Sequence, residues 1–381
     1  MIDHANLSVD AIDLADPTAP VSEALLLSSS VEEIDILDPT SGESIGEVAE
    51  SSAVDAEATM KRARAQADDG RWSQMGPHER QSLLERLIAV IDDKADALTE
   101  LGTLESGTPI VYSRSIHVDA PLRLLHEASA RPTENGLDVV VLPVNQPTYF
   151  AMRTVAASLA AGRASVVVPS PLAPLTTIAL MNCLLEADLP KGVVSAVLGT
   201  PDVLATIRSS ETFSSLLDVG SGGADAGATP ILQLPGADVD LALKDALLAH
   251  QKAPGWRTGL AHLLVPEDEL DDYLARASDL VDALSVGDPW SPDTQVGSIP
   301  GGSQALNTYL ADLTSGSARL TQGAEPEDPQ HFLAPTVVSG LTDPKSAASG
   351  AFAGPVACII AYPDVDSAKQ WVAGSYQRVA N

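Results

Sequence analysis

The chain contains 381 residues, of which 45% are hydrophobic and 19% charged, and its net charge is −30. This length allows two or three domains with their own cores, and the composition is typical of a globular α/β protein. A negative field repels nucleic-acid phosphates and anionic lipid headgroups, so the charge argues against nucleic-acid binding and against binding to a membrane surface. A solvated acidic surface accounts for the charge.

The two cysteines, Cys183 and Cys358, lie far apart in the sequence and inside apolar runs. This placement indicates buried thiols in a reducing compartment, and it favours neither a disulfide framework nor a metal site. The first residues lack the basic start of a signal peptide, and no apolar run reaches the length of a membrane span. We therefore expect a cytoplasmic protein.

The first third of the chain predicts an extension, a hairpin and helices. Residues 1–31 are acidic and weakly patterned, which indicates a flexible extension. Alternating residues over 34–50, on either side of a turn at 39–42, predict a β-hairpin. Residues 52–72 then predict an amphipathic helix that begins with a Ser/Asp cap, and 78–107 predict one long helix that ends before Gly107.

From residue 137 onward, apolar strands alternate with helices, which is typical of a doubly wound parallel sheet. The expected elements are strands at 137–142, 164–170, 193–199, 213–220, 262–266, 336–340 and 357–363, and helices at 149–162, 176–190, 202–210, 269–289 and 366–375. We expect a Rossmann-like domain over residues 32–245 and a second α/β domain over residues 246–381.

Nine short segments occur in the order found in the aldehyde dehydrogenase superfamily, which the chain therefore resembles. They are residues 38–43 (DPTSGE), 70–80 (GRW and Arg80), 104–109 (LESGTP), 143–147 (PVNQP), 159–162 (LAAG), 189–193 (LPKGV), 286–289 (VGDP), 334–336 (APT) and 354–356 (GPV).

The resemblance implies a cofactor-type Rossmann-like domain that faces a catalytic α/β domain, together with an oligomerisation element of strands. The segment between Gly107 and Asn145 is shorter than in typical family members, and the chain stops at Asn381 without the usual C-terminal part. We expect the oligomerisation strands to be missing, which places the family's usual tetramer in doubt.

The segment at residues 251–265 resembles the family's nucleophile segment, and it places Arg257 where the family has its cysteine. A thiolate attacks the aldehyde in that chemistry. Arginine stays protonated at any working pH and has no lone pair for this attack. The resemblance therefore implies a site without its nucleophile.

Two further catalytic positions follow from the resemblance. Gln233 falls on the glutamate that serves as the general base, and its amide cannot accept the proton. Asn145 falls on the asparagine of the oxyanion hole and is retained, although an amide at the end of a strand can also hold a loop in place.

The positions that bind NAD or NADP in the family are altered as well. Val168 falls on the lysine that contacts the adenosine ribose, and Ala351 falls on the glutamate that contacts the nicotinamide ribose. Gly220 and Ser221 match the glycine turn at the pyrophosphate, where Asp218 would add negative charge. We expect no intact cofactor site and no metal site.

Three hypotheses stay open. The first is a family member without oxidation activity that serves as a structural or regulatory partner, for example of an active paralogue, since paired aldehyde dehydrogenases can include one degenerate copy. The second is a residual NAD(P)-dependent oxidoreductase or a carboxylate-binding module, with Arg257 as the anion clamp. The third is a truncated gene product.

Overall fold

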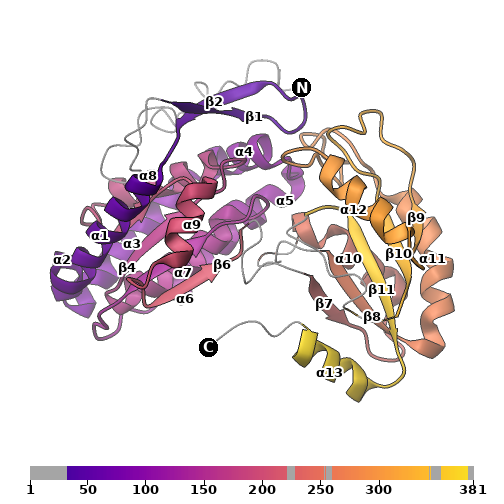
Figure 1. Cartoon of the computed structure of the whole chain (residues 1–381). Helices are drawn as coiled ribbons and strands as arrows, with labels where there is room; N and C mark the ends of the chain where they lie inside the picture. The colour runs from indigo at the N-terminus through magenta and orange to yellow at the C-terminus, as the bar shows by residue number, and fades with distance from the viewer. Residues whose placement is uncertain are drawn as a thin grey trace. The chain divides into compact units, whose positions relative to one another are not determined.

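The computed structural model describes residues 32–220, 228–252, 254, 260–342, 344 and 353–375, which form two compact units (Figure 1). Within these ranges, unit 1 comprises residues 32–38, 42–106 and 113–218, and unit 2 comprises 39–41, 107–112 and the chain from Val219 onward. The expected extension at residues 1–31 lies outside the described ranges.

The division between the units differs from the expected boundary between residues 245 and 246. That boundary would fall inside helix α10 (Val239–Lys252), which packs on the sheet of unit 2. Strand β7 (Thr229–Leu232) also pairs with β8 (Ala261–Pro266). The chain therefore divides just after Asp218, because the segments that follow bury their apolar side chains in the second core.

The predicted hairpin is confirmed. Strand β1 (Glu33–Leu37) pairs antiparallel with β2 (Ser44–Ala49). The turn is closed by the Asp38 amide, which donates to the Glu43 carbonyl at 2.9 Å, and by the Gly42 amide, which donates to the Asp38 carbonyl at 2.8 Å. Gly42 has a φ of 73°, a conformation that favours glycine over other residues.

Helix α1 (Ala53–Asp69) begins as the sequence predicts. The Ser52 side chain accepts from the Asp55 amide, and the Asp55 carboxylate accepts from the Ser52 amide in return. This reciprocal capping box satisfies two donors at the start of the helix. A short helix α2 (Arg71–Gln74) follows.

The prediction of one long helix over residues 78–107 is wrong, because the helix is broken at Lys94. Helix α3 (Pro77–Asp93) ends there, and α4 (Ala95–Ser106) begins immediately afterwards. Lys94 has φ and ψ of −98° and 13°, and its Nζ lies 3.1 Å from the Glu186 carboxylate. Apolar spacing continues across the break, so periodicity alone does not reveal it.

A helical segment that the sequence does not predict follows Gly107. It consists of α5 (Ile110–Arg114), a π-helical turn η3 (Ser115–Asp119) and α6 (Ala120–Glu127). His117 in the π-turn is fully buried, and burial lowers its pKa to about 4. Its Nδ1 lies 3.2 Å from the Thr148 hydroxyl.

Unit 1 is built on a four-stranded parallel sheet with the order β5-β4-β3-β6. Its elements are β3 (Leu137–Val141), α7 (Pro147–Ala161), β4 (Ala164–Val168), α8 (Leu175–Glu186), β5 (Val194–Ala196), α9 (Pro201–Ser209) and β6 (Ser215–Asp218). The strand order reverses direction between β3 and β6, so the predicted doubly wound arrangement is confirmed.

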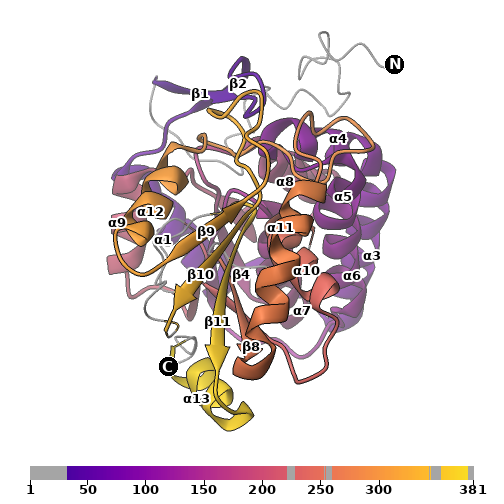
Figure 2. The ribbon, with the colours of Figure 1, turned by 90° about the vertical axis from the view of Figure 1, so that its right-hand side faces the viewer.

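Unit 2 contains a five-stranded sheet with the order β7-β8-β11-β10-β9. Figure 2 shows its strands β8, β9, β10 and β11. Its remaining elements are η4 (Glu267–Glu269), α11 (Leu270–Ala283), α12 (Gln304–Thr314), β9 (Arg319–Gln322), β10 (Thr336–Leu341), β11 (Val356–Tyr362) and α13 (Val365–Ser375). Strand β9 is antiparallel to β10, whereas the other pairs are parallel. The sequence did not predict β7, α10, β9 or α12.

Alternate residues of β11 pack on opposite faces of this sheet. Ala357 and Ile359 join the cluster formed with α10 and α11, whereas Cys358 joins the cluster formed with α12. Both faces are covered, which explains why β11 reads as a continuous apolar run.

Two short segments from the first part of the chain, residues 39–41 and 107–112, belong to unit 2. In the first, the Thr40 hydroxyl lies 2.9 Å from the Ser298 hydroxyl. In the second, the Gln251 side chain donates to the Gly107 carbonyl at 3.4 Å and accepts from the Gly297 amide at 3.1 Å. A Cβ atom on Gly297 would lie 1.9 Å from the Gly107 carbonyl oxygen, so these two backbones meet only because residue 297 is glycine.

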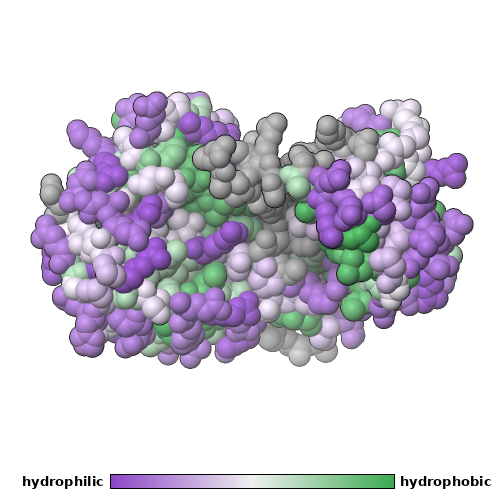
Figure 3. All heavy atoms as spheres, turned by 90° about the horizontal axis from the view of Figure 1, so that it is seen from below, coloured by the Kyte–Doolittle hydropathy of each residue, from purple (hydrophilic) through white to green (hydrophobic). Residues whose placement is uncertain are grey.

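Hydrophilic residues are mixed with apolar ones on the face shown in Figure 3. No helix in the described ranges is both long and apolar enough to pass through a membrane.

The start of helix α8 is capped by a carboxylate that is distant in the sequence. Pro174 at the N-cap has no polar side chain, and Glu105 of α4 accepts instead from the Leu175 amide, from the Thr176 amide at 2.8 Å and from the Thr176 hydroxyl at 2.6 Å. The side chain is 1% exposed. Burial raises the pKa of Glu105 to about 7, although the hydrogen bonds from Thr176 oppose this shift.

We predict that Glu105 makes stability decrease as the pH rises from about 4.5 to above 7. Because its pKa is higher in the folded state, folding takes up a proton there, and the stabilisation is complete below the unfolded pKa and lost as the pH rises through about 7. Urea unfolding of the native protein and of Glu105→Gln from pH 5 to 8 measures this. Relative to Glu105→Gln, the native protein should lose about 3 kcal/mol of unfolding free energy between pH 5 and pH 8.

The matched control is Glu211→Gln, which changes an exposed carboxylate. Its unfolding free energy should follow that of the native protein at every pH. Parallel curves for the native protein and Glu105→Gln would contradict the prediction.

Candidate functional site

Ligands of doubly wound sheets bind beyond the carboxyl ends of the strands, so the residues at the ends of β3, β4 and β6 form the candidate ligand-binding end of unit 1. Asn145 follows β3, Val168 ends β4 and Asp218 ends β6. Gly220 and Gln233 belong to unit 2.

Asn145 lies between β3 and α7 and is 5% exposed. Gln146 is the N-cap of α7, with φ and ψ of −149° and 52°, and Pro147 is the first helical residue. The Thr148 hydroxyl contacts buried His117 at 3.2 Å. The start of α7, directly after Asn145, is therefore tied to the core, and the structural role of the retained amide stays a prediction.

Val168 is fully buried and packs in the apolar cluster of unit 1. Its neighbours in this cluster include Val197, Val203 and Ile207. A valine offers no charge and no hydrogen bond to a ribose. At this position the chain therefore does not fit the adenosine end of NAD or NADP in the manner that the family resemblance implies.

Asp218, at the end of β6, is 3% exposed and forms an ion pair with Arg208. The Arg208 Nε atom lies 2.7 Å from the Asp218 carboxylate. This pair corrects the expectation that Asp218 presents a bare negative charge to an anion, because the guanidinium of α9 neutralises it. Residue spacing did not reveal the pair.

Gln233 directly follows β7 and is half-buried. Its backbone amide donates to the Leu264 carbonyl at 2.9 Å, and its backbone carbonyl accepts from the Tyr362 hydroxyl at 2.6 Å. The backbone at this position is thus fixed to β8 and β11. The side chain is an amide, which cannot serve as a general base.

Of the four remaining expected site positions, the structure describes one. Gly220 is buried two residues after β6. Arg257, Ser221 and Ala351 lie outside the described residues. Within the described ranges, no group of three or more His, Cys, Asp or Glu side chains is arranged to hold a metal ion.

Both cysteines lie in cores. Cys183 is fully buried in the middle of α8, where its Sγ contacts the Ala179 carbonyl at 3.4 Å. Cys358 is fully buried in β11. Burial raises the pKa of each thiol to about 12, so neither supplies a thiolate at neutral pH.

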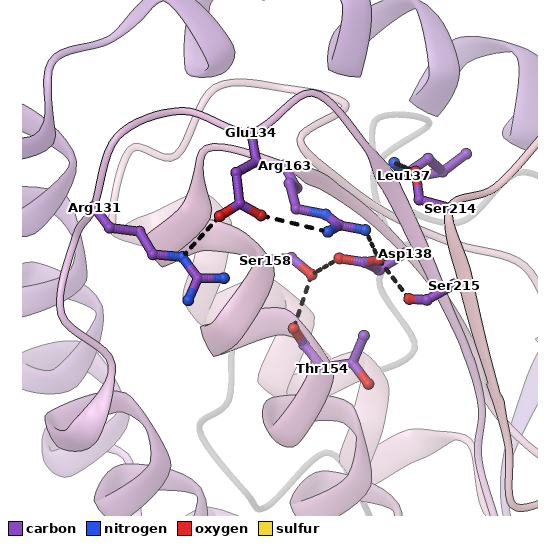
Figure 4. Close-up of polar contacts among 9 residues, drawn as sticks. All are labelled: Arg131, Glu134, Leu137, Asp138, Thr154, Ser158, Arg163, Ser214 and Ser215. Atoms are coloured by element: carbon purple, nitrogen blue, oxygen red, sulfur yellow. Dashed lines mark hydrogen bonds and ion pairs between the residues drawn. The ribbon is translucent and has the colours of Figure 1, made fainter. Parts of the chain in front are cut away.

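A polar network that the sequence did not predict lies at the opposite end of the unit 1 sheet, where the strands begin (Figure 4). Asp138 of β3 accepts from Ser158 at 2.6 Å, from Ser215 at 2.5 Å and from Arg163, which also pairs with Glu134. This network lies at the amino ends of β3, β4 and β6, away from the edge where ligands bind. Its role is therefore structural. A single aspartate within a run of valines was the signal that could have revealed it.

Together, the two α/β units and the loops at the strand ends define a dinucleotide-binding type of fold. The aldehyde dehydrogenase family model matches residues 26–226 and 225–377, so the chain belongs to this family.

Relatives by sequence include a putative aldehyde dehydrogenase, DhaS, of Bacillus subtilis, which is 25% identical over 85% of this chain and 74% of its own length. A betaine aldehyde dehydrogenase of Cereibacter sphaeroides is 27% identical over 86% of this chain and 76% of its own length. The chain thus aligns with about three quarters of each relative.

Solved structures show the same fold. A Mycobacterium tuberculosis aldehyde dehydrogenase in complex with NAD+ superposes with a TM-score of 0.78 at 24% identity, covering 91% of this chain and 81% of that one. A mutant of Pseudomonas syringae aldehyde dehydrogenase C, in complex with NAD+ and octanal, gives a TM-score of 0.75 at 24% identity, covering 89% and 78%.

We predict that neither thiol of the folded protein reacts with a disulfide reagent such as Ellman's reagent at pH 8. Both are fully buried with raised pKa values, so reaction requires unfolding. In guanidinium chloride both cysteines should react. Leu172→Cys provides a control, because Leu172 is 51% exposed and a thiol there should react at once. Rapid reaction of the native protein would show that a cysteine is accessible.

Proposed function

We propose that this aldehyde dehydrogenase family protein does not oxidise aldehydes with NAD or NADP and acts as a structural or regulatory partner, in particular of an active paralogue. The burial of both cysteines carries the proposal. The chain has two cysteines, and each side chain is fully enclosed in a core. The family's nucleophile position, by sequence, holds Arg257, which cannot form a thioester.

The base and the cofactor contacts support the same conclusion. Gln233 cannot take a proton from water, and Val168 is packed in the apolar cluster. By sequence, Ala351 replaces the second ribose contact. The loss of one charge-assisted contact costs about 1.5–3 kcal/mol, so two losses weaken cofactor binding by about two to four orders of magnitude.

NAD+ is bound in several solved relatives. For this chain we propose that neither NAD nor NADP is a resident cofactor. The preserved cores and capping interactions support a folded protein with a role other than oxidation, because the changes fall on the chemistry-bearing positions while the packing positions stay apolar.

We predict no reduction of NAD or NADP when the protein is incubated with a panel of aldehydes. The rate should equal that of Arg257→Ala, because neither protein has a nucleophile. Absorbance at the wavelength of the reduced cofactor measures this, with an active aldehyde dehydrogenase as the positive control. Stoichiometric reduced cofactor, formed faster by the native protein than by Arg257→Ala, would refute the proposal.

The partner role predicts a complex in the source organism. A tagged chain recovered from native extract should carry an aldehyde dehydrogenase whose own sequence retains the catalytic cysteine, as identified by intact mass and peptide sequencing. The control is a tagged unrelated protein of similar net charge, because an acidic surface collects basic proteins non-specifically. Recovery of the chain without an aldehyde dehydrogenase would argue against a paralogous partner.

A further inference from the structure

Unit 2 contains a pocket of about 530 Å³ beside the end of α11, which we name the α11 pocket. Its apolar wall is formed by Val281, Leu284, Val286, Phe332 and Pro335. This volume is within the range of about 300–1,000 Å³ that is typical of small-molecule sites. The pocket lies in a single unit, so its shape does not depend on how the two units are arranged.

The segments that shape the pocket are fixed by backbone contacts. Gly323 donates to the Pro335 carbonyl at 3.0 Å, which closes the connection between β9 and β10. A Cβ atom on Gly323 would lie 2.4 Å from the Val281 carbonyl oxygen, so the connection packs directly on the end of α11. Phe332 donates to the Asp328 carbonyl at 3.1 Å and is 8% exposed. The apolar wall is therefore preformed.

Carboxylates surround this apolar wall. The lining includes Asp282, Asp288, Glu325, Glu327 and Asp328, and no Lys or Arg is among the described lining residues. Asp328 is paired with His331 at 2.7 Å. The other four carboxylates are exposed and take part in no ion pair within the described part of the chain, and Asp288 accepts from the Trp290 amide at 2.9 Å. They add negative charge beside the apolar wall that attracts a cation.

We infer that the α11 pocket binds a free small organic cation, an ammonium group attached to an apolar body. The apolar wall buries the body, and the carboxylates at the rim accept charge-assisted hydrogen bonds from the ammonium group. An anion of the same shape is repelled. The inference does not depend on the proposed loss of oxidation activity, because none of the expected catalytic or cofactor positions lines this pocket.

Three probes with similar apolar bodies test the charge requirement: phenethylammonium, 2-phenylethanol and 3-phenylpropionate. The chain contains four phenylalanines, so the protein labelled with 4-fluorophenylalanine gives a simple ¹⁹F NMR spectrum in which Phe332→Leu assigns the pocket signal. Phenethylammonium should shift the Phe332 signal in a saturable manner, whereas 3-phenylpropionate should leave it unchanged. The neutral alcohol should bind more weakly than the amine.

The triple variant Asp282→Asn, Glu325→Gln and Glu327→Gln removes rim charges without altering the apolar wall. It should weaken phenethylammonium binding by about tenfold or more, because several partly exposed charge contacts are lost together.

The matched control carries Asp271→Asn, Glu267→Gln and Glu211→Gln, which remove the same charge at exposed positions outside the pocket. It should change binding by about twofold or less, since salt screens distant charges. Three results would overturn the inference: equal shifts with all three probes, no shift of the Phe332 signal with phenethylammonium, or equal weakening by the two triple variants.

Discussion

A buried carboxylate in a central strand holds the first unit together. Asp138 is 7% exposed in β3, and its partners come from the end of α7, from the residue before β4 and from the start of β6. These contacts fix the amino ends of three neighbouring strands at once. Removal of one member of such a buried charged pair typically costs about 3–5 kcal/mol, so this side chain contributes strongly to the stability of the unit.

The opposite, carboxyl-terminal end of the same sheet is also occupied by packed and paired side chains. With the strands fixed in register, the residues that end β4 and β6 have defined surroundings, and Val168 falls inside the apolar core while Asp218 meets Arg208. The carboxyl ends of the strands, where a dinucleotide would bind, therefore contain the packed side chain of Val168 and the ion pair between Arg208 and Asp218. The valine and the ion pair at these two strand ends lie on a parallel sheet of the kind found throughout the family.

Local sequence signals predicted the elements that are stabilised locally. The turn before Gly42, the Ser52–Asp55 capping box and the valine-rich strands β3 and β4 all followed from spacing and residue type. The break at Lys94 and the antiparallel strand β9 did not, because each depends on tertiary context: Lys94 pairs with Glu186, and β9 is a short strand paired with β10. Only the folded chain brings these partners together.

The candidate site was predicted by resemblance more than by spacing. Asn145, Gln233 and Val168 could be located only through family motifs, and the structure then added their burial and bonding. Glu105 shows the limit of local reasoning, because the helix that it caps begins at Leu175, far along the chain.

The second unit is not one continuous stretch of chain, since it includes residues 39–41 and 107–112. Gln251 binds Gly107, and Ser298 contacts Thr40, so residues from both early segments are built into its hydrogen bonding. A gene fragment that began at residue 219 would encode the sheet but would omit these partners. The two units are therefore interleaved modules, and recombination could not exchange either of them by a single crossover.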